Sequence, residues 1–121
     1  MTTDPCPFCE IVAGRAPATV VAEWPEALAI EPLNPVTRGH LLVIPRQHVR
    51  DFVENPQVSA ATMLCAAEFL TGMGSYNLIT SKGRPATQSV FHLHLHLIPR
   101  AEDDGLALPW YSGKSSKPRE R

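Results

Sequence analysis

The sequence predicts an α+β domain: a five-stranded antiparallel sheet with one long and one short helix. Three features of the chain lead to this fold class. They are five short apolar runs, one long segment with helical spacing of its apolar residues, and short connections between the runs. Short connections favour antiparallel neighbours, because parallel strands need a longer crossover. The 121 residues suit a single domain, expected over residues 1–112, with residues 113–121 as a disordered tail.

Turn-forming residues separate the five apolar runs. Pro25 and Glu26 divide the first two runs, Pro45 ends the third, and Pro99 ends the last. Proline cannot donate the hydrogen bond that continues a β-ladder, so it marks strand ends. The expected strands are residues 20–24, 27–31, 40–44, 76–80 and 91–98.

Two segments carry helix signals. Residues 7–13 are predicted to form a short helix that Gly14 stops. Asn55 and Pro56 open a longer one, in which apolar residues recur at helical spacing as far as Gly72. This second segment is the long helix of the predicted fold.

Charge and hydropathy exclude several classes of protein. With 11 basic and 12 acidic residues the net charge is −1, so no basic surplus points to nucleic acid or to an anionic membrane. No apolar run approaches the roughly 20 residues of a membrane span, and the first residues lack the pattern of a signal peptide. We therefore expect a cytoplasmic protein with no nucleic-acid or membrane partner. In that compartment paired cysteines indicate metal or redox chemistry more often than a structural disulfide.

Three histidines alternate with leucines in the last predicted strand. Because alternate side chains of a strand share a face, His92, His94 and His96 are expected to project together, about 6–7 Å apart. Such a row of imidazoles either ligates a metal or handles phosphate, with one ring as nucleophile and another as hydrogen-bond donor. The plain alternative is a solvated strand face.

This strand and several upstream segments resemble the histidine triad (HIT) family. Residues 88–98 read QSVFHLHLHLI, which contains the family signature of three histidines alternating with apolar residues. Residues 33–35 (LNP), 39–40 (GH) and 42–48 (LVIPRQH) are similar to its second block. Residues 6–11 (CPFCEI) look like the opening of its zinc-bearing, bacterial-type members. The resemblance covers nearly the whole predicted domain.

The resemblance implies a HIT-like fold that pairs as a homodimer into one ten-stranded sheet, with a purine nucleotide as substrate. Family members cleave a bond at the α-phosphorus, and by this match His94 is the nucleophile. It forms a nucleotidyl-histidine that water then resolves. His96 and Ser89 are implied as further catalytic residues, with Ser89 near the leaving group. His40 matches a histidine beside the triad, either orienting a ring or shuttling a proton, or simply buried and hydrogen-bonded.

The same match implies a nucleotide-binding set. A base pocket falls on Phe8, Ile11 and Leu33, with ordinary core packing as the alternative. Pro32 stands where the family commonly has the aspartate that holds ribose, so ribose recognition is expected to be weak. Ser81 stands where the phosphoramidase branch has an asparagine. The residues matched to the phosphate and its surroundings are Ser81, Thr87, Gln88, Ser89, His94 and His96.

Cys6 and Cys9 form a Cys-x-x-Cys pair near the start of the chain. In zinc-bearing members of the family two histidines complete the site, and the resemblance places them at His48 and His92. Four such ligands give the tetrahedral Cys2His2 set of a structural zinc. The alternative is a pair of reduced thiols without a metal.

Two substrate classes remain open at this point. Nucleoside phosphoramidates suit the main branch of the family, and dinucleoside polyphosphates suit the branch in which Pro-Arg follows the triad, as Pro99 and Arg100 do here. Arg100 then either meets an extra phosphate or is solvated. A third interpretation, from another functional class, is a nucleotide-binding or scaffold protein without physiological turnover.

Overall fold

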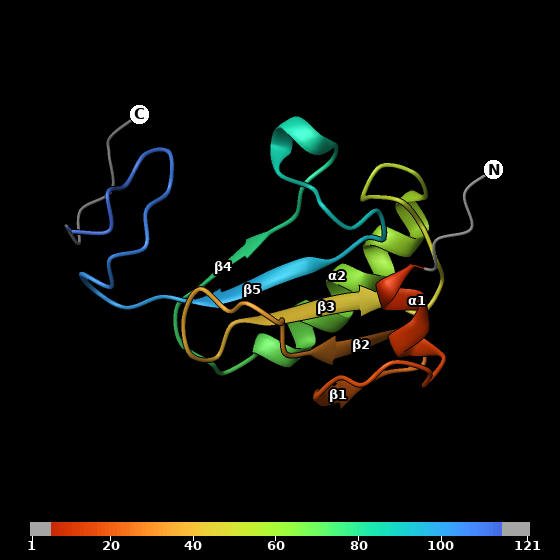
Figure 1. Cartoon of the computed structure of the whole chain (residues 1–121). Helices are drawn as coiled ribbons and strands as arrows, with labels where there is room; N and C mark the ends of the chain where they lie inside the picture. The colour runs from red at the N-terminus through yellow and green to blue at the C-terminus, as the bar shows by residue number, and fades with distance from the viewer. Residues whose placement is uncertain (1–5, 115–121) are drawn as a thin grey trace.

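Five antiparallel strands and two helices make up residues 6–114, the part of the chain that the structure, a computed structural model, describes (Figure 1). The sheet order is β1-β2-β3-β5-β4, and every neighbouring pair is antiparallel. The predicted fold class is therefore confirmed. In chain order the elements are α1 (Pro7–Val12), β1 (Val20–Glu23), β2 (Ala27–Ile30), β3 (Leu41–Pro45), α2 (Pro56–Leu70), β4 (Tyr76–Ile79), a short 3₁₀ turn η1 (Arg84–Ala86) and β5 (Leu95–Pro99).

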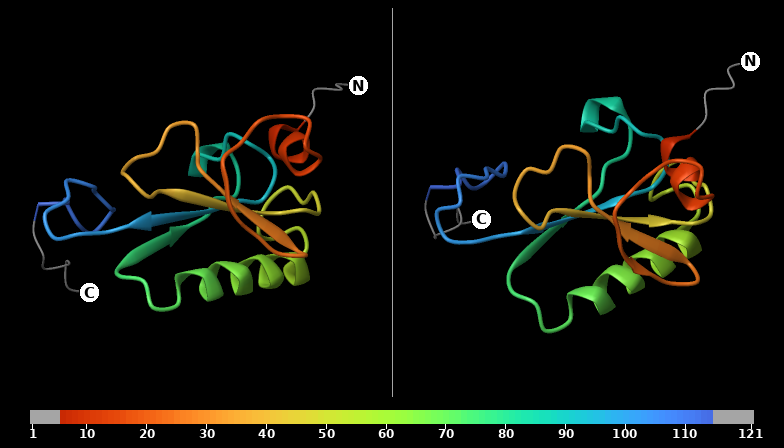
Figure 2. Two further views of the ribbon diagram at one scale, coloured as in Figure 1. Left: turned by 90° about the horizontal axis from the view of Figure 1, so that it is seen from below. Right: turned by 60° about the horizontal axis from the view of Figure 1, so that its bottom comes forward.

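Both faces of the sheet are covered. α2 lies across one face, while α1, the loop after β2 and the η1 segment rise on the other (Figure 2). Side chains of β2 alternate between the two faces: Ala27 and Ala29 join the core beneath α2, and Leu28 and Ile30 join the core beside α1. Because each face is buried, β2 is apolar at every position, and its alanines leave room for a closely packed helix.

α2 begins and ends where its capping residues predict. The Asn55 side-chain oxygen accepts the backbone N–H groups of Gln57 and Val58 at 3.1 and 3.3 Å, and Pro56 occupies the first turn, where its missing N–H costs nothing. The helix ends at Leu70, two residues before Gly72. Within residues 6–114, no helix is long and apolar enough to cross a bilayer.

The predicted histidine strand is wrong at its start, because β5 begins only at Leu95. The carbonyls that an extended ladder needs are taken by side chains instead. The ring of His92 bonds the Pro45 carbonyl at 2.9 Å, and the Thr80 hydroxyl donates to the carbonyl of His94 at 2.8 Å. The chain therefore bends through residues 90–92, and this bend directs His92 away from the row that strict alternation predicts.

Residues 100–114 form a folded segment after β5, which we call the C-terminal hook. Gly105 donates its N–H to the carbonyl of Gly113 at 2.9 Å, and Leu108 and Tyr111 exchange backbone hydrogen bonds. A Cβ at Gly113 would lie 2.6 Å from the backbone of Gly105, so only glycine fits there. The predicted disordered tail is thus wrong for residues 113 and 114, and residues 115–121 lie outside the described part of the chain.

Candidate active site and zinc centre

Four potential metal ligands converge beside α1. Cys6 and Cys9 come from the start of α1, His48 from the loop after β3, and His92 from the bend before β5, and their ligand atoms all lie within 4.8 Å of one another. His92 Nδ1 lies 3.4 Å from Cys6 Sγ, 3.5 Å from Cys9 Sγ and 3.1 Å from His48 Nδ1. Neighbouring ligands of a tetrahedral zinc are about 3.3–3.8 Å apart, given metal–ligand bonds of roughly 2.0–2.3 Å. The two distances from His92 to sulfur fall within this range and the distance to His48 falls about 0.2 Å below it, so the spacing fits zinc with a small adjustment of the His48 ring.

A hydrogen bond at Nε2 fixes His92 in the tautomer whose Nδ1 can bind a metal. Nε2 lies 2.9 Å from the backbone carbonyl of Pro45. A carbonyl only accepts, so Nε2 carries the proton and the lone pair of Nδ1 faces the two sulfurs. Burial, and then the hydrogen bond with Cys6, raise the pKa of Cys9 to about 11. Without metal this thiol keeps its proton, and zinc binding has to release it. The four side chains form a Cys2His2 site of the structural zinc type, as predicted.

His94 has one nitrogen fixed and one free. Its Nδ1 lies 2.8 Å from the backbone carbonyl of His92, so Nδ1 carries the proton and Nε2 keeps an unshared electron pair. The edges of Phe8 and His96 contact its ring, with centroid separations of 5.2 and 5.1 Å. An imidazole in this tautomer presents Nε2 as a nucleophile without prior deprotonation.

His96 is held in the opposite tautomer by a directed chain of hydrogen bonds. The backbone N–H of Val36 donates to Nδ1 of His40 at 3.0 Å, which leaves the His40 proton on Nε2. That proton points at Nδ1 of His96, 3.0 Å away. Neutral His96 then carries its own proton on Nε2. Burial, followed by the neighbouring His94 and His40, lowers the pKa of His96 to about 4, so His96 is a neutral hydrogen-bond donor near pH 7.

All five histidines of the chain belong to this one assembly. His48 packs edge-on against His92, and His96 links His94 to His40. The metal centre and the candidate nucleophile are thus adjacent, and the five-residue stretch from His92 to His96 contributes side chains to both.

The loop before the triad is folded around the side chain of Gln88, which is 4% exposed. Its Oε1 accepts the N–H of Gly83 at 2.8 Å, and its Nε2 donates to the carbonyls of Arg50 and Val90 at 2.7 and 3.1 Å. Both amide hydrogens are therefore used within the protein. In this structure Gln88 braces the loop, and its side chain has no free donor for the phosphate contact that was predicted for it.

The other predicted phosphate-loop residues differ in exposure. Thr87 and Ser89 are exposed on either side of Gln88, and Ser81 is half-buried at the end of β4. Thr87 has φ +73°, a left-handed conformation that is unusual for a β-branched residue. Thr87 ends η1 in this conformation, and Ser89, two residues later, is exposed.

The three residues of the predicted base pocket do not form one wall. Phe8 is buried in the core beside α1, and Ile11 is half-buried against the same core. Leu33 instead stands in the loop after β2 with 97% of its surface exposed. No other large apolar side chain of residues 6–114 is so exposed. Leu33 is thus available to a bound base, whereas Phe8 offers it little surface.

Three groups at the site escape sequence reasoning. They are the N–H of Val36, the carbonyl of Pro45 and the hydroxyl of Thr80. Two are main-chain groups, whose direction no residue type reveals. Thr80 closes an apolar strand and has no motif of its own, so only the observed pairing of β4 with β5 identifies its role.

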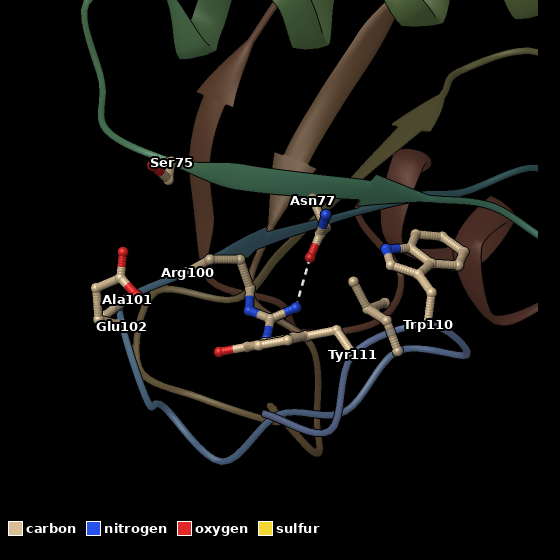
Figure 3. Close-up of a pocket in the computed structure, with 8 residues that line it drawn as sticks. Ser75, Asn77, Arg100, Ala101, Glu102, Trp110 and Tyr111 are labelled. Carbon is tan, nitrogen blue, oxygen red and sulfur yellow. Dashed lines mark hydrogen bonds between the residues drawn. The ribbon is translucent and has the colours of Figure 1, made fainter. Parts of the chain in front are cut away.

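Arg100, which was a candidate for an extra phosphate, is a structural residue of the C-terminal hook. Its guanidinium bonds both oxygens of Asp104 at 2.8 and 3.0 Å and the Asn77 side chain at 2.6 Å. It also donates to the Leu106 carbonyl at 2.5 Å. Its free face stacks over Tyr111 (Figure 3). Four of its five N–H groups are thus engaged, and its hydrogen bonds to the Asp104 carboxylate hold the pKa of that group well below its usual range.

Comparison with known proteins identifies the family. The model of the HIT domain matches residues 13–103. An uncharacterised HIT-like protein of Methanocaldococcus jannaschii is 40% identical over 106 residues, which cover 83% of this chain and 82% of that protein. The adenosine 5′-monophosphoramidase of Schizosaccharomyces pombe is 37% identical over 111 residues, with 88% and 84% covered.

Solved structures agree with this sequence match. A zinc-bound histidine triad protein from Mycobacterium smegmatis superimposes with a TM-score of 0.75 at 36% identity, covering 84% of this chain and 79% of that one. Its bound zinc is in keeping with the Cys2His2 cluster found here. The chain therefore belongs to the histidine triad (HIT) family, among whose members are hydrolases.

Proposed function

We propose that this protein hydrolyses purine nucleoside phosphoramidates at the α-phosphorus, with His94 as the nucleophile. The observation that carries the proposal is the tautomer of His94: its Nδ1–H is bound to the His92 carbonyl at 2.8 Å, which frees Nε2 for attack. The name of the Schizosaccharomyces pombe relative supports the same substrate class.

The surrounding groups fit a double displacement. In the first step Nε2 of His94 attacks phosphorus, a P–N bond to histidine forms, and the P–N bond to the leaving amine breaks as that amine takes up a proton from solvent water. The Nε2–H of neutral His96 donates to a phosphoryl oxygen, where negative charge grows in the transition state. The exposed hydroxyl of Ser89 is assigned to the leaving group, as the family resemblance implies. In the second step water attacks the nucleotidyl-histidine and regenerates the free ring.

The position of Arg100 favours phosphoramidates over dinucleoside polyphosphates. Arg100 lies beyond the end of β5, six residues after His94. A strand advances about 3.3 Å per residue, so the two backbone positions are roughly 20 Å apart. The guanidinium is also committed to Asp104, Asn77 and Leu106. The residue that supported the polyphosphate interpretation is thus unavailable, within its own chain, to a phosphate at His94.

A hydrolysis panel tests this proposal. We expect an adenosine phosphoramidate to be cleaved at least about tenfold faster, in kcat/KM, than diadenosine tri- or tetraphosphate, a difference of about 1.4 kcal/mol in transition-state binding. Arg100→Ala, checked for an intact fold, is expected to leave the ratio unchanged. Faster cleavage of the polyphosphates, with loss of that preference in Arg100→Ala, would reverse the assignment. Tight nucleotide binding with no turnover of any substrate would establish the scaffold alternative.

We also propose that the protein is a homodimer in which two copies of β4 pair. β4 is the outer strand beside β5, and no neighbour within residues 6–114 covers its second edge. The outer surface of α2 carries two adjacent apolar side chains, Met63 and Leu64, which are 48% and 61% exposed. Antiparallel addition of β4 to β4 of a second copy would use the free edge and give ten strands.

Sedimentation measurements test the dimer. We propose that the exposed surface of α2 around Leu64 is also covered in the dimer, so Leu64→Asp is expected to shift the protein toward monomer. Val21→Asp is the matched control, because Val21 is similarly exposed at 43% but lies on β1, at the other edge of the sheet. A wild-type protein that is monomeric at micromolar concentration would refute the pairing, as would a Val21→Asp variant that dissociates while Leu64→Asp does not.

A further inference from the structure

We propose that Phe8 is a positioning residue, through which the zinc-binding segment fixes the ring of His94. The inference rests on the proposed function only in taking His94 as the nucleophile. It assigns Phe8 a role different from the base-pocket contact that the family resemblance implies.

Phe8 is wedged between a metal ligand and the candidate nucleophile. Its ring centroid lies 5.2 Å from that of His94 at an interplanar angle of 74°, and 5.7 Å from that of His92 at 86°. Both are edge-to-face contacts of the favourable kind. Phe8 is only 8% exposed, and the rest of its surface packs on a core made of Leu28, Ile30, Leu42 and Ile44. Little of its ring is left for a base to stack on.

The position of Phe8 depends on the two cysteines that flank it. α1 has six residues, far fewer than an isolated helix needs to persist in water. Phe8 lies between Cys6 and Cys9, and these two side chains face His48 and His92 on separate segments. Closing the cluster with a metal ties α1 to the end of β3 and to the triad, and so presses the Phe8 ring against His94.

Phe8 supplies a restraint that the hydrogen bond of His94 lacks. A single Nδ1–H bond to the His92 carbonyl fixes the tautomer but still allows the ring to rock about that bond. The edges of Phe8 and His96 contact the ring as well and limit this motion. Attack on phosphorus needs Nε2 aligned with the bond that breaks, so looser positioning lowers the rate of chemistry more than the affinity for nucleotide.

The test compares Phe8→Leu with a matched change in the same helix. Val12→Ala is the control, because Val12 also packs on this core from α1, lies outside the predicted nucleotide-binding set and has no ring to contact a histidine. For Phe8→Leu we expect kcat to fall by about ten- to a hundredfold, the size of effect that misplacement by about 1 Å produces, with KM and the dissociation constant for nucleoside monophosphate within about threefold of wild type. Phe8→Tyr retains the ring edge and is expected to recover most of kcat. Val12→Ala is expected to change kcat by less than about threefold.

A second readout does not depend on turnover. In ring NMR spectra of histidine-labelled protein, the His94 signal is expected to broaden or split in Phe8→Leu and to remain sharp in Val12→Ala. Removing metal from wild type is expected to reproduce that change, and removing it from Phe8→Leu is expected to add little, because both act through the same contact.

Opposite outcomes would overturn the proposal. A raised KM with an unchanged kcat in Phe8→Leu would show that Phe8 contacts the base and does not position His94. An unaltered His94 ring signal in both Phe8→Leu and metal-free protein would show that neither Phe8 nor the metal centre holds the ring. If wild type cleaves no nucleotide, the proposed function fails, but the ring spectra still decide whether Phe8 positions His94.

Discussion

Replacing His94 by alanine is expected to remove essentially all turnover while nucleotide binding stays within about tenfold of wild type. The attacking group contributes most of its effect in the transition state and little to ground-state affinity, so kcat falls and the dissociation constant barely moves. The measurement is kcat for an adenosine phosphoramidate beside calorimetric binding of the monophosphate.

Two comparisons sharpen this prediction. His96→Ala is expected to be milder, because it removes a donor to the phosphoryl oxygen and leaves the nucleophile in place. A His94→Ala protein that retains more than about 5% of the wild-type rate would show that another group attacks phosphorus.

Loss of the zinc centre is expected to have the largest effect on stability. Protein purified without chelator should contain about one zinc per chain, and Cys9→Ser should lose the metal and several kcal/mol of folding free energy, since ligand contacts to a structural zinc contribute directly to folding. Metal analysis and thermal unfolding of the two proteins provide the measurement.

The third cysteine offers a matched control. Cys65 lies on the buried face of α2 and outside the metal cluster. Cys65→Ala is expected to lower the melting temperature modestly, as a core truncation does, and to keep its zinc. A wild-type protein that is metal-free as purified and melts at the same temperature after chelation would refute the structural role.

Much of the fold follows from local patterns in the sequence. The apolar runs and the prolines that end them predict four strands to within a residue at each end, and Asn55 with Pro56 predicts the start of α2. These signals succeed because each strand or helix start is decided by its own hydrophobic face and capping groups.

The last strand shows where such patterns fail. Alternation predicts a strand from residue 91, but His92 and Thr80 supply side-chain partners to carbonyls that a longer ladder would use. Side chains and a β-ladder compete for the same backbone carbonyls. The outcome depends on which segments meet in space, and a single sequence does not show this. The departure falls at the functional site, where local rules are most often overridden.

The residue types of the candidate site were predictable from the sequence, but which of them face a ligand and which support other residues was not. The metal ligands Cys6, Cys9, His48 and His92 meet as the resemblance implies. Gln88 and Phe8, in contrast, turn inward to hold the loop and the ring of His94, although both match ligand contacts of the family. Burial decides between contact with substrate and support of another residue, and burial of a single side chain is set by packing from both faces of the sheet.

The stereochemical course at phosphorus tests the central claim, a nucleotidyl-His94 intermediate, most directly. Hydrolysis of a phosphoramidate made chiral at phosphorus, in isotopically labelled water, distinguishes one in-line displacement from two. Two displacements, the first by Nε2 of His94 and the second by water, predict overall retention of configuration in the product. Overall inversion would mean that water attacks the substrate directly, and it would contradict the covalent role of His94.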